Sequence, residues 1–200
     1  MARSARRKAT YDDVIRVPDH QIAEILDGEL VVSPRPAPKH AAVGTLIGAD
    51  LCGPFHRRQG GAGGPGGWRI LDEPELHLGG HVIVPDLAGW RRERLPRLPD
   101  AAAIEVVPDW VCEIYSPTSK RTDRLRKTRI YASLGVSHLW RVDPLELEVE
   151  ILRLSGEHYL VVDVHSGAGT VRAEPFDAVP LDLGRWWDYD DDVEPPTESP

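Results

Sequence analysis

The stretch Trp110-Val-Cys-Glu-Ile-Tyr-Ser-Pro117, with the helical pattern from Thr122 to Leu134 that follows it, defines the centre of the expected fold. Trp110 to Tyr115 is a short apolar strand, and the Ser-Pro pair ends it. Gly135 is well placed to stop the helix, because glycine readily adopts the left-handed conformation found at helix ends. A second strand is predicted from His138 to Val142, where apolar and polar residues alternate.

Upstream, Ile22 to Val32 is predicted to form two short strands joined by Asp27-Gly28, a pair that tolerates the positive φ angles of a two-residue hairpin turn. A helix is expected from Pro38 to Arg58, and a flexible loop where glycine fills six of the eight positions from 60 to 67. Further strands are predicted at Trp68 to Leu71, Glu75 to Leu78, Val82 to Trp90, Leu147 to Leu154, His158 to Val164 and Gly169 to Ala173, with a loop from Arg91 to Pro108.

The order of hairpin, helix, strands, helix and strands indicates an α/β or α+β domain built around one mixed sheet flanked by helices. A chain of 200 residues is long enough for one domain with a real core. We expect a flexible basic arm at residues 1–10, the domain at 11–187, and an acidic, disordered tail at 188–200.

Two carboxylates fall where an apolar side chain is expected. In the predicted strand Val82 to Trp90, alternation puts Asp86 on the same face as Val84 and Ala88. In the strand that begins at Trp110, Glu113 shares a face with Val111 and Tyr115. A lone buried carboxylate costs several kcal/mol unless it is paired or binds a metal. Two such acids on adjacent strands predict a site for Mg²⁺ or Mn²⁺, which prefer oxygen ligands.

Lys127 is the third member of the predicted set. It lies on one helical stripe with Ile130, Tyr131 and Leu134, at the spacing i, i+3, i+4, i+7. The chain has only four lysines among its 24 basic residues, so a lysine on an inward stripe is a stronger signal than usual. The alternative is a surface ion pair between Asp123 and Lys127, four residues apart.

Two inward carboxylates, a divalent ion and a lysine form a set able to cleave phosphodiesters. The metal lowers the pKa of bound water and neutralises the scissile phosphate, while the lysine stabilises developing charge or orients the water. The competing interpretation of Asp86, Glu113 and Lys127 is a buried ion network with a purely structural role.

The net charge of −8 argues against a nucleic-acid partner, but its distribution weakens that argument. Six acids and no base lie in residues 186–200. Solvated surface charge is the alternative explanation of the basic clusters. These clusters are Arg91, Arg92, Arg94 and Arg97, and then Lys120, Arg121, Arg124, Arg126, Lys127 and Arg129.

The expected location is the cytoplasm. The sequence contains no apolar run long enough for a transmembrane helix, and no apolar segment follows the basic start as in a secretory signal. Cys52 and Cys112 lack the CxxC spacing of a metal or redox motif, which favours a reduced chain. A zinc site at His77 and His81 is disfavoured, because Gly79-Gly80 between them indicates a turn.

Several of these segments together resemble a known family. The chain is similar to the Uma2 family of bacterial proteins in the PD-(D/E)XK nuclease superfamily, which has a restriction-endonuclease-like fold. The similarity covers about residues 10 to 187. It rests on Glu24-Ile-Leu-Asp-Gly-Glu-Leu-Val-Val-Ser-Pro34, His40, Val84-Pro-Asp-Leu87, Val111-Cys-Glu-Ile-Tyr-Ser-Pro-Thr118, Asp123-Arg-Leu-Arg-Lys127 with Tyr131-Ala132, and Leu139-Trp-Arg-Val-Asp-Pro144.

The resemblance implies that Asp86 and Glu113 are metal ligands, with the backbone carbonyl of Ile114 as a further ligand. The superfamily's lysine normally lies two residues after the second acid, where this chain has Tyr115. In the Uma2 group it has moved to the following helix, at the place of Lys127. Glu29 and His40 also fall in family motifs, which implies that they line the site, although a capping role or a core hydrogen bond explains His40 equally well.

Two functions follow as expectations. The first is a Mg²⁺- or Mn²⁺-dependent endonuclease that hydrolyses DNA, with Asp86, Glu113 and Lys127 as catalytic residues. The second is a catalytically silent nuclease-fold domain that acts as a binding or assembly module, favoured by the acidic tail and by Tyr115 in place of lysine. The resemblance also implies a homodimer, for which an exposed strand edge would serve.

Overall fold

The computed structural model describes residues 7–58, 63–116 and 121–188, without the side chains of residues 121–123. Its main feature is a six-stranded mixed sheet, in which the two central strands are parallel and the other neighbours antiparallel. In spatial order the strands are β10 (His158–Ser166), β9 (Glu148–Ser155), β8 (His138–Asp143), β7 (Trp110–Ile114), β6 (Leu87–Arg91) and β3 (Trp68–Asp72).

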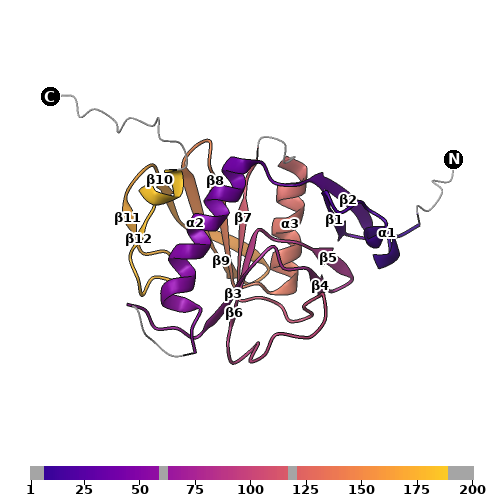
Figure 1. The fold of residues 1–200 in the computed structure, drawn as a ribbon, viewed down its shortest axis with the longest axis horizontal. Coiled ribbons are helices and arrows are strands. Elements are labelled where there is room, and N and C mark those ends of the chain that lie inside the picture. Colours follow the sequence, from indigo (N-terminus) through magenta and orange to yellow (C-terminus); the bar gives the residue numbers. More distant parts are fainter. Residues whose placement is uncertain (1–6, 59–62, 117–120, 189–200) are drawn as a thin grey trace.

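The second sheet is smaller and lies beside the main one (Figure 1). It contains the predicted hairpin, whose turn residues Asp27 and Gly28 have φ angles of 50° and 78° as a two-residue turn requires. Its spatial order is β2 (Glu29–Pro34), β1 (Gln21–Leu26), β5 (His81–Ile83) and β4 (Leu76–Leu78), and a separate pair joins β11 (Thr170–Val171) to β12 (Leu181–Asp182).

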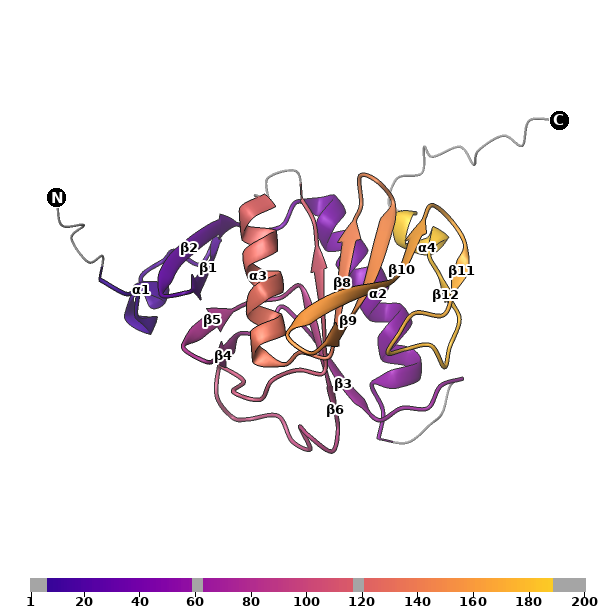
Figure 2. The ribbon, with the colours of Figure 1, turned by 180° about the vertical axis from the view of Figure 1, so that it is seen from behind.

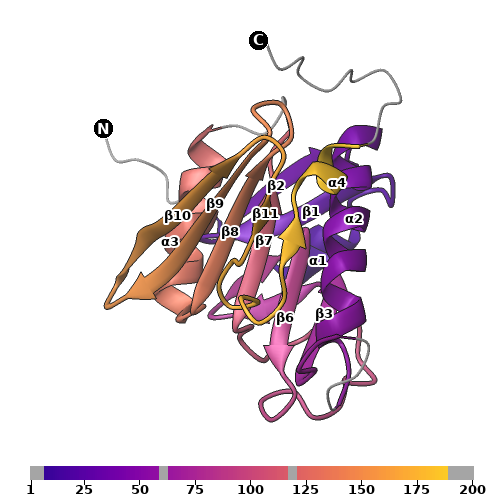
Figure 3. The same ribbon diagram turned by 90° about the vertical axis from the view of Figure 1, so that its left-hand side faces the viewer.

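Two long helices, α2 (Pro38–Phe55) and α3 (Arg121–Leu134), cover opposite faces of the main sheet. α2 is in front in Figure 1 and α3 is in front in Figure 2, and Figure 3 shows both flanking the strands. Each was predicted, and each differs from its predicted bounds by only a few residues. Gly135 follows the last residue of α3 with a φ angle of 82° and ends that helix, as predicted. Two short helices are α1 (Tyr11–Ile15) and α4 (Gly184–Trp187).

The prediction of one continuous strand from Val82 to Trp90 is wrong. The segment divides into β5 in the small sheet and β6 in the main sheet, with Val84-Pro85-Asp86 between them. Pro85 has no N–H to donate to a ladder, which favours a break at this point. Asp86 therefore lies in a link between two sheets, and its position does not follow from strand alternation.

The core has two layers, one on each face of the main sheet. On the α2 face, Trp68, Trp110 and Trp140 pack their rings around Phe176, with centroids 4.8 to 5.6 Å apart. On the α3 face, Val111 and Tyr131 are fully buried in a second cluster. Because side chains alternate along β7, Trp110 lies in the layer on the α2 face and Val111 lies in the layer on the α3 face.

Gly89 of β6 is the position where this packing is tightest. A Cβ there would lie 3.1 Å from Trp110 Cε3 and 3.3 Å from Trp68 Cε3, and Phe176 holds both rings in place. Gly48 in α2 is less constrained: apart from its chain neighbours and the helix's own backbone, an added Cβ would meet only Leu87 Cδ2, at an ordinary 3.8 Å.

We predict that Gly89→Ala lowers the free energy of unfolding by about 1–3 kcal/mol, because the added methyl overpacks two buried rings. The matched change Gly48→Ala raises it by about 0.5–1 kcal/mol, because alanine is the better helix former and its methyl makes only an ordinary contact. Urea denaturation measures both. Unchanged stability of Gly89→Ala would contradict the packing described here.

Candidate active site

Asp86 lies just before β6 and is held by both neighbouring elements. Its Oδ2 accepts a hydrogen bond from the backbone N–H of Ile114 at 2.6 Å, at the end of β7. Its Oδ1 lies 3.2 Å from Nε2 of His40, in the first turn of α2. Its backbone carbonyl accepts a bond from Glu73 N at 3.0 Å. The carboxylate is therefore fixed at the strand ends, although it does not belong to a strand.

His40 brings together two of the predicted metal-ligating oxygens. Its Nε2 donates to the carbonyl oxygen of Ile114 at 2.9 Å and lies 3.2 Å from Asp86 Oδ1. The two oxygens therefore converge on one point. Burial lowers the pKa of His40, but the hydrogen bonds to Asp86 and the Ile114 carbonyl and the charges of Asp86 and Glu113 together more than offset this, so the pKa is raised overall.

Glu113 projects from β7 toward α3. Its Oε1 accepts hydrogen bonds from Lys127 Nζ at 2.8 Å and from the hydroxyl of Tyr131 at 2.5 Å. Burial raises the pKa of Glu113 to about 7, although the charge of Lys127 acts in the opposite direction. Burial also raises the pKa of Tyr131, so its hydroxyl remains a donor at neutral pH.

Lys127 is buried, with 9 % of its surface exposed, as its place on the stripe with Ile130 and Tyr131 predicts. Besides Glu113, its Nζ contacts Glu24 Oε1 at 3.1 Å and donates to the carbonyl oxygen of Val84 at 3.1 Å. Burial acts to lower the pKa of Lys127, but the two carboxylates raise it above its usual value. The predicted alternative partner, the side chain of Asp123, lies outside the described residues.

Glu24 of β1 was not predicted as a site residue. It is buried, and its Oε1 also accepts the backbone N–H of Val84 at 2.9 Å. The signal was present in the sequence, because alternation puts Glu24 on one strand face with Ile22 and Leu26, just as it puts Glu113 on one face with Val111. The rule that identified Asp86 and Glu113 therefore applies to Glu24 as well.

These groups line one pocket of about 380 Å³ between the two sheets and the start of α2. Asp86, Glu113, Lys127 and His40 all lie on its wall, so the structure brings together the three residues predicted as catalytic. The other lining residues are Ile22, Glu24, Ser33, Pro34, Arg35, Pro36, Ala37, Val84, Ile114 and Ser116.

The donor set suits a hard divalent cation. Asp86 Oδ1 and the Ile114 carbonyl already converge on a positively polarised atom, the N–H of His40, and Glu113 lies next in sequence to Ile114. Within the described residues, no three His, Cys, Asp or Glu side chains are grouped as metal ligands. Two carboxylates, a carbonyl and water suit Mg²⁺ or Mn²⁺ better than zinc.

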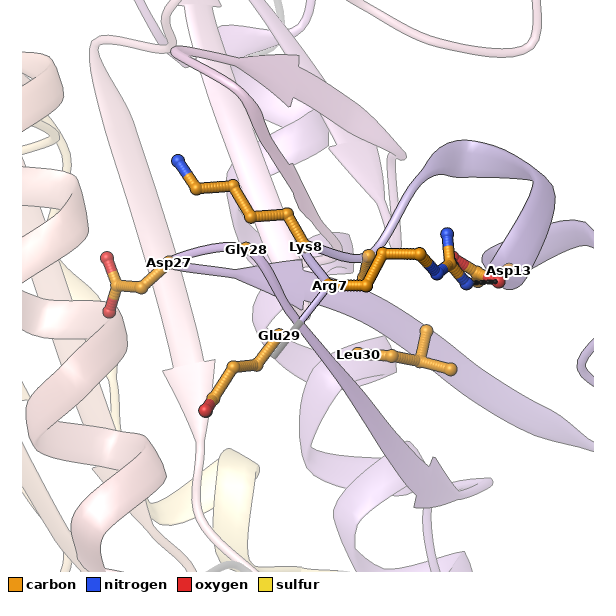
Figure 4. Close-up of a pocket in the computed structure, with 8 residues that line it drawn as sticks. Arg7, Lys8, Asp13, Asp27, Gly28, Glu29 and Leu30 are labelled. Atoms are coloured by element: carbon orange, nitrogen blue, oxygen red, sulfur yellow. Dashed lines mark hydrogen bonds and ion pairs between the residues drawn. The ribbon is translucent and has the colours of Figure 1, made fainter. Parts of the chain in front are cut away.

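Glu29 lies outside this pocket. It belongs to a separate hollow of about 550 Å³ at the hairpin turn, where Arg7 pairs with Asp13 (Figure 4). Its carboxylate and that of Asp27 bind Arg126 of α3 instead, at 3.1 and 2.8 Å. The resemblance thus pointed correctly to His40 as a lining residue, whereas the structure gives Glu29 a partner on α3 and no place at the pocket.

Three other residues considered in the sequence have partners that explain them. His77 contacts Glu75 at 2.8 Å, and Nδ1 of His81 accepts the backbone N–H of Asp27 at 3.1 Å. The two imidazoles thus serve different contacts on either side of the turn. Tyr115, at the superfamily's usual lysine position, lies against the Arg124 guanidinium, 3.7 Å from the ring centroid.

A mixed sheet with acids at adjoining strand ends defines this chain as a restriction-endonuclease-like protein. The Uma2 family model, described as "Putative restriction endonuclease", matches residues 9–183, and the chain belongs to that family. A solved structure of "a putative nuclease belonging to DUF820" from Anabaena variabilis ATCC 29413 has the same fold, with a TM-score of 0.72 and 22 % identity over 90 % of this chain and 97 % of that one. No curated protein matches the chain. The family supports a nuclease, and the solved structure shows the fold.

We predict that Lys127→Met lowers the free energy of unfolding by about 3–5 kcal/mol, because it leaves two buried carboxylates without their shared cation. Arg129→Met is the matched control, since Arg129 is exposed on the same helix, and it should change stability by less than about 0.5 kcal/mol. Chemical denaturation compares the two. Equal stability would show that the Lys127 charge is not held by Glu24 and Glu113.

Proposed function

We propose that this chain is a Mg²⁺- or Mn²⁺-dependent endonuclease that hydrolyses phosphodiester bonds of DNA. The observation that carries the proposal is the convergence of Asp86 Oδ1 and the Ile114 carbonyl oxygen on one point, beside a second carboxylate bound to a buried lysine. In the described residues no helix combines the length and apolarity needed to cross a bilayer.

Asp86, Glu113 and the Ile114 carbonyl would hold the metal. When bound, the ion lowers the pKa of a coordinated water and neutralises charge on the scissile phosphate. His40 keeps Asp86 and the Ile114 carbonyl aligned through its Nε2. The bond from Ile114 N to Asp86 Oδ2 fixes the spacing between the two strand ends.

Lys127 acts as a charge-stabilising group and not as a base in this proposal. Because Glu24 and Glu113 raise its pKa, it keeps all its protons at neutral pH and can only donate hydrogen bonds. Its ammonium would orient the attacking water or stabilise charge on a phosphate oxygen as the new P–O bond forms and the leaving P–O bond breaks. Glu24 is a positioning residue, because it holds the lysine together with Glu113.

We predict metal-supported nicking of plasmid DNA by the purified chain, and a loss of about a hundredfold or more in Asp86→Asn and Glu113→Gln. Glu29→Gln is the matched control, because it removes a carboxylate that contacts Arg126 outside the pocket, and it should keep full activity. Equal cleavage by wild type and Asp86→Asn would contradict the proposal.

Metal binding should depend on pH through Glu113. Coordination requires the carboxylate, and burial raises the pKa of Glu113 to about 7, so the affinity for Mn²⁺ should rise about tenfold per pH unit below pH 7 and level off above it. Titration calorimetry from pH 5.5 to 8.5 measures this, with Glu29→Gln again as the control. A flat profile would exclude Glu113 as a ligand, and no binding at millimolar metal would favour the silent binding module.

A further inference from the structure

Five arginines gather at the end of the main sheet opposite to Asp86. Arg91 is the last residue of β6, while Asp86 directly precedes that strand, so about 15 Å of extended chain separates them. β3, the edge strand, begins at this end and packs against α2, which runs from the candidate site to the same place (Figure 1). The arginine cluster, as we call it, consists of Arg57, Arg58, Arg69, Arg91 and Arg92.

No ion pair in the described part of the chain joins an arginine of this cluster to a carboxylate. The nearby Arg94 differs, because it binds Asp109 at 2.6 Å. Glu93 is an exposed acid in the same loop and has no such pair among the described residues. The cluster therefore keeps its positive charge on a chain whose net charge is −8.

Neutral groups hold the guanidinium groups in place. Arg69 donates to the carbonyl oxygens of Leu95, at 2.6 Å, and Pro96. The guanidinium carbon of Arg91 lies 4.1 Å from the ring centroid of Trp68. Such contacts orient an arginine without cancelling its charge, which leaves it able to bind an anion.

Arg92 is the most constrained member. Its Nη2 makes a long bond of 3.4 Å to the carbonyl oxygen of His56, and its buried Nε has no hydrogen-bond partner. Burial and the charges of Arg69 and Arg58 lower the pKa of Arg92. Like charges that influence one another in this way repel, and a multivalent anion bound at the exposed parts of these side chains would relieve the repulsion.

We propose that the arginine cluster binds the sugar–phosphate backbone of duplex DNA, a few base pairs away from the phosphate at Asp86. Arginine forks match phosphate oxygens, and such contacts position a duplex without reading its sequence. A separation of about 15 Å corresponds to about four base pairs of rise. The inference rests on the proposed nuclease function for the identity of its polyanion.

The test measures DNA binding without cleavage, using Asp86→Asn as the silent background and no added metal. Into this background we introduce Arg58→Gln together with Arg92→Gln. The charge-matched control carries Arg153→Gln together with Arg172→Gln. These two changes replace exposed arginines, of which Arg153 binds Glu174 and Arg172 binds the Asp177 carbonyl. Fluorescence anisotropy with a 20-base-pair duplex from 50 to 200 mM salt gives the affinity and its salt dependence.

We expect the cluster variant to bind about tenfold more weakly at 0.1 M salt, with the slope of log K against log salt reduced by about two, while the control stays near the background. Arg58→Gln alone, an exposed change that should not disturb folding, should reduce the slope by about one. An unchanged slope in the cluster variant, an equal loss in the control, or no DNA binding by the background would each overturn the inference.

The outcome is separable from that of the proposed function. Cleavage by the wild type with an unchanged slope in the cluster variant refutes the inference alone. Binding through the cluster in a protein that never cleaves DNA refutes the proposed endonuclease alone, because the binding assay uses neither metal nor Asp86.

Discussion

The buried ammonium of Lys127 is the interaction on which the site depends. It contacts Glu24 of the small sheet, the Val84 carbonyl in the link between sheets, and Glu113 of the main sheet. Removing an ion from water costs several kcal/mol, and the cost is offset only where opposite charges and hydrogen bonds surround the ion closely. The lysine therefore constrains the small sheet, the link and β7 to one arrangement, and that arrangement places Asp86 beside Ile114.

The same contacts determine the chemistry available at the pocket. Two carboxylates keep Lys127 protonated, while burial raises the pKa of Glu113 to about 7. A divalent cation at Asp86 and Glu113 would bring added positive charge close to the lysine, which weakens its hold on Glu113 and favours ionisation of that acid. A structural ion network and a catalytic site are thus not exclusive interpretations, because the network that stabilises the metal-free fold consists of the groups that the metal would use.

The sequence predicted the site residues best where the direction of a side chain depends on a single helix or strand. The stripe of Lys127, Ile130 and Tyr131 follows from helix periodicity, and the inward face of Glu113 follows from alternation in β7. Asp86 was identified for a reason that is only partly valid, because Pro85 divides its strand between two sheets. The convergence at His40 joins residues 74 positions apart, and no local pattern encodes that distance.

The arginine cluster shows the same limit. Arg91 and Arg92 form part of a basic run that the sequence displays, but Arg57, Arg58 and Arg69 come from α2's end and β3, and only the fold unites them. β3 and β6 pair antiparallel, so the start of β3 lies beside the end of β6. At the other end of these two strands, Asp72 pairs with Leu87, the residue after Asp86. One pair of strands therefore has carboxylates at one end and arginines at the other. A duplex held by its backbone at the arginine end would position a phosphate at the carboxylate end, where a cation is needed to neutralise the repulsion between them.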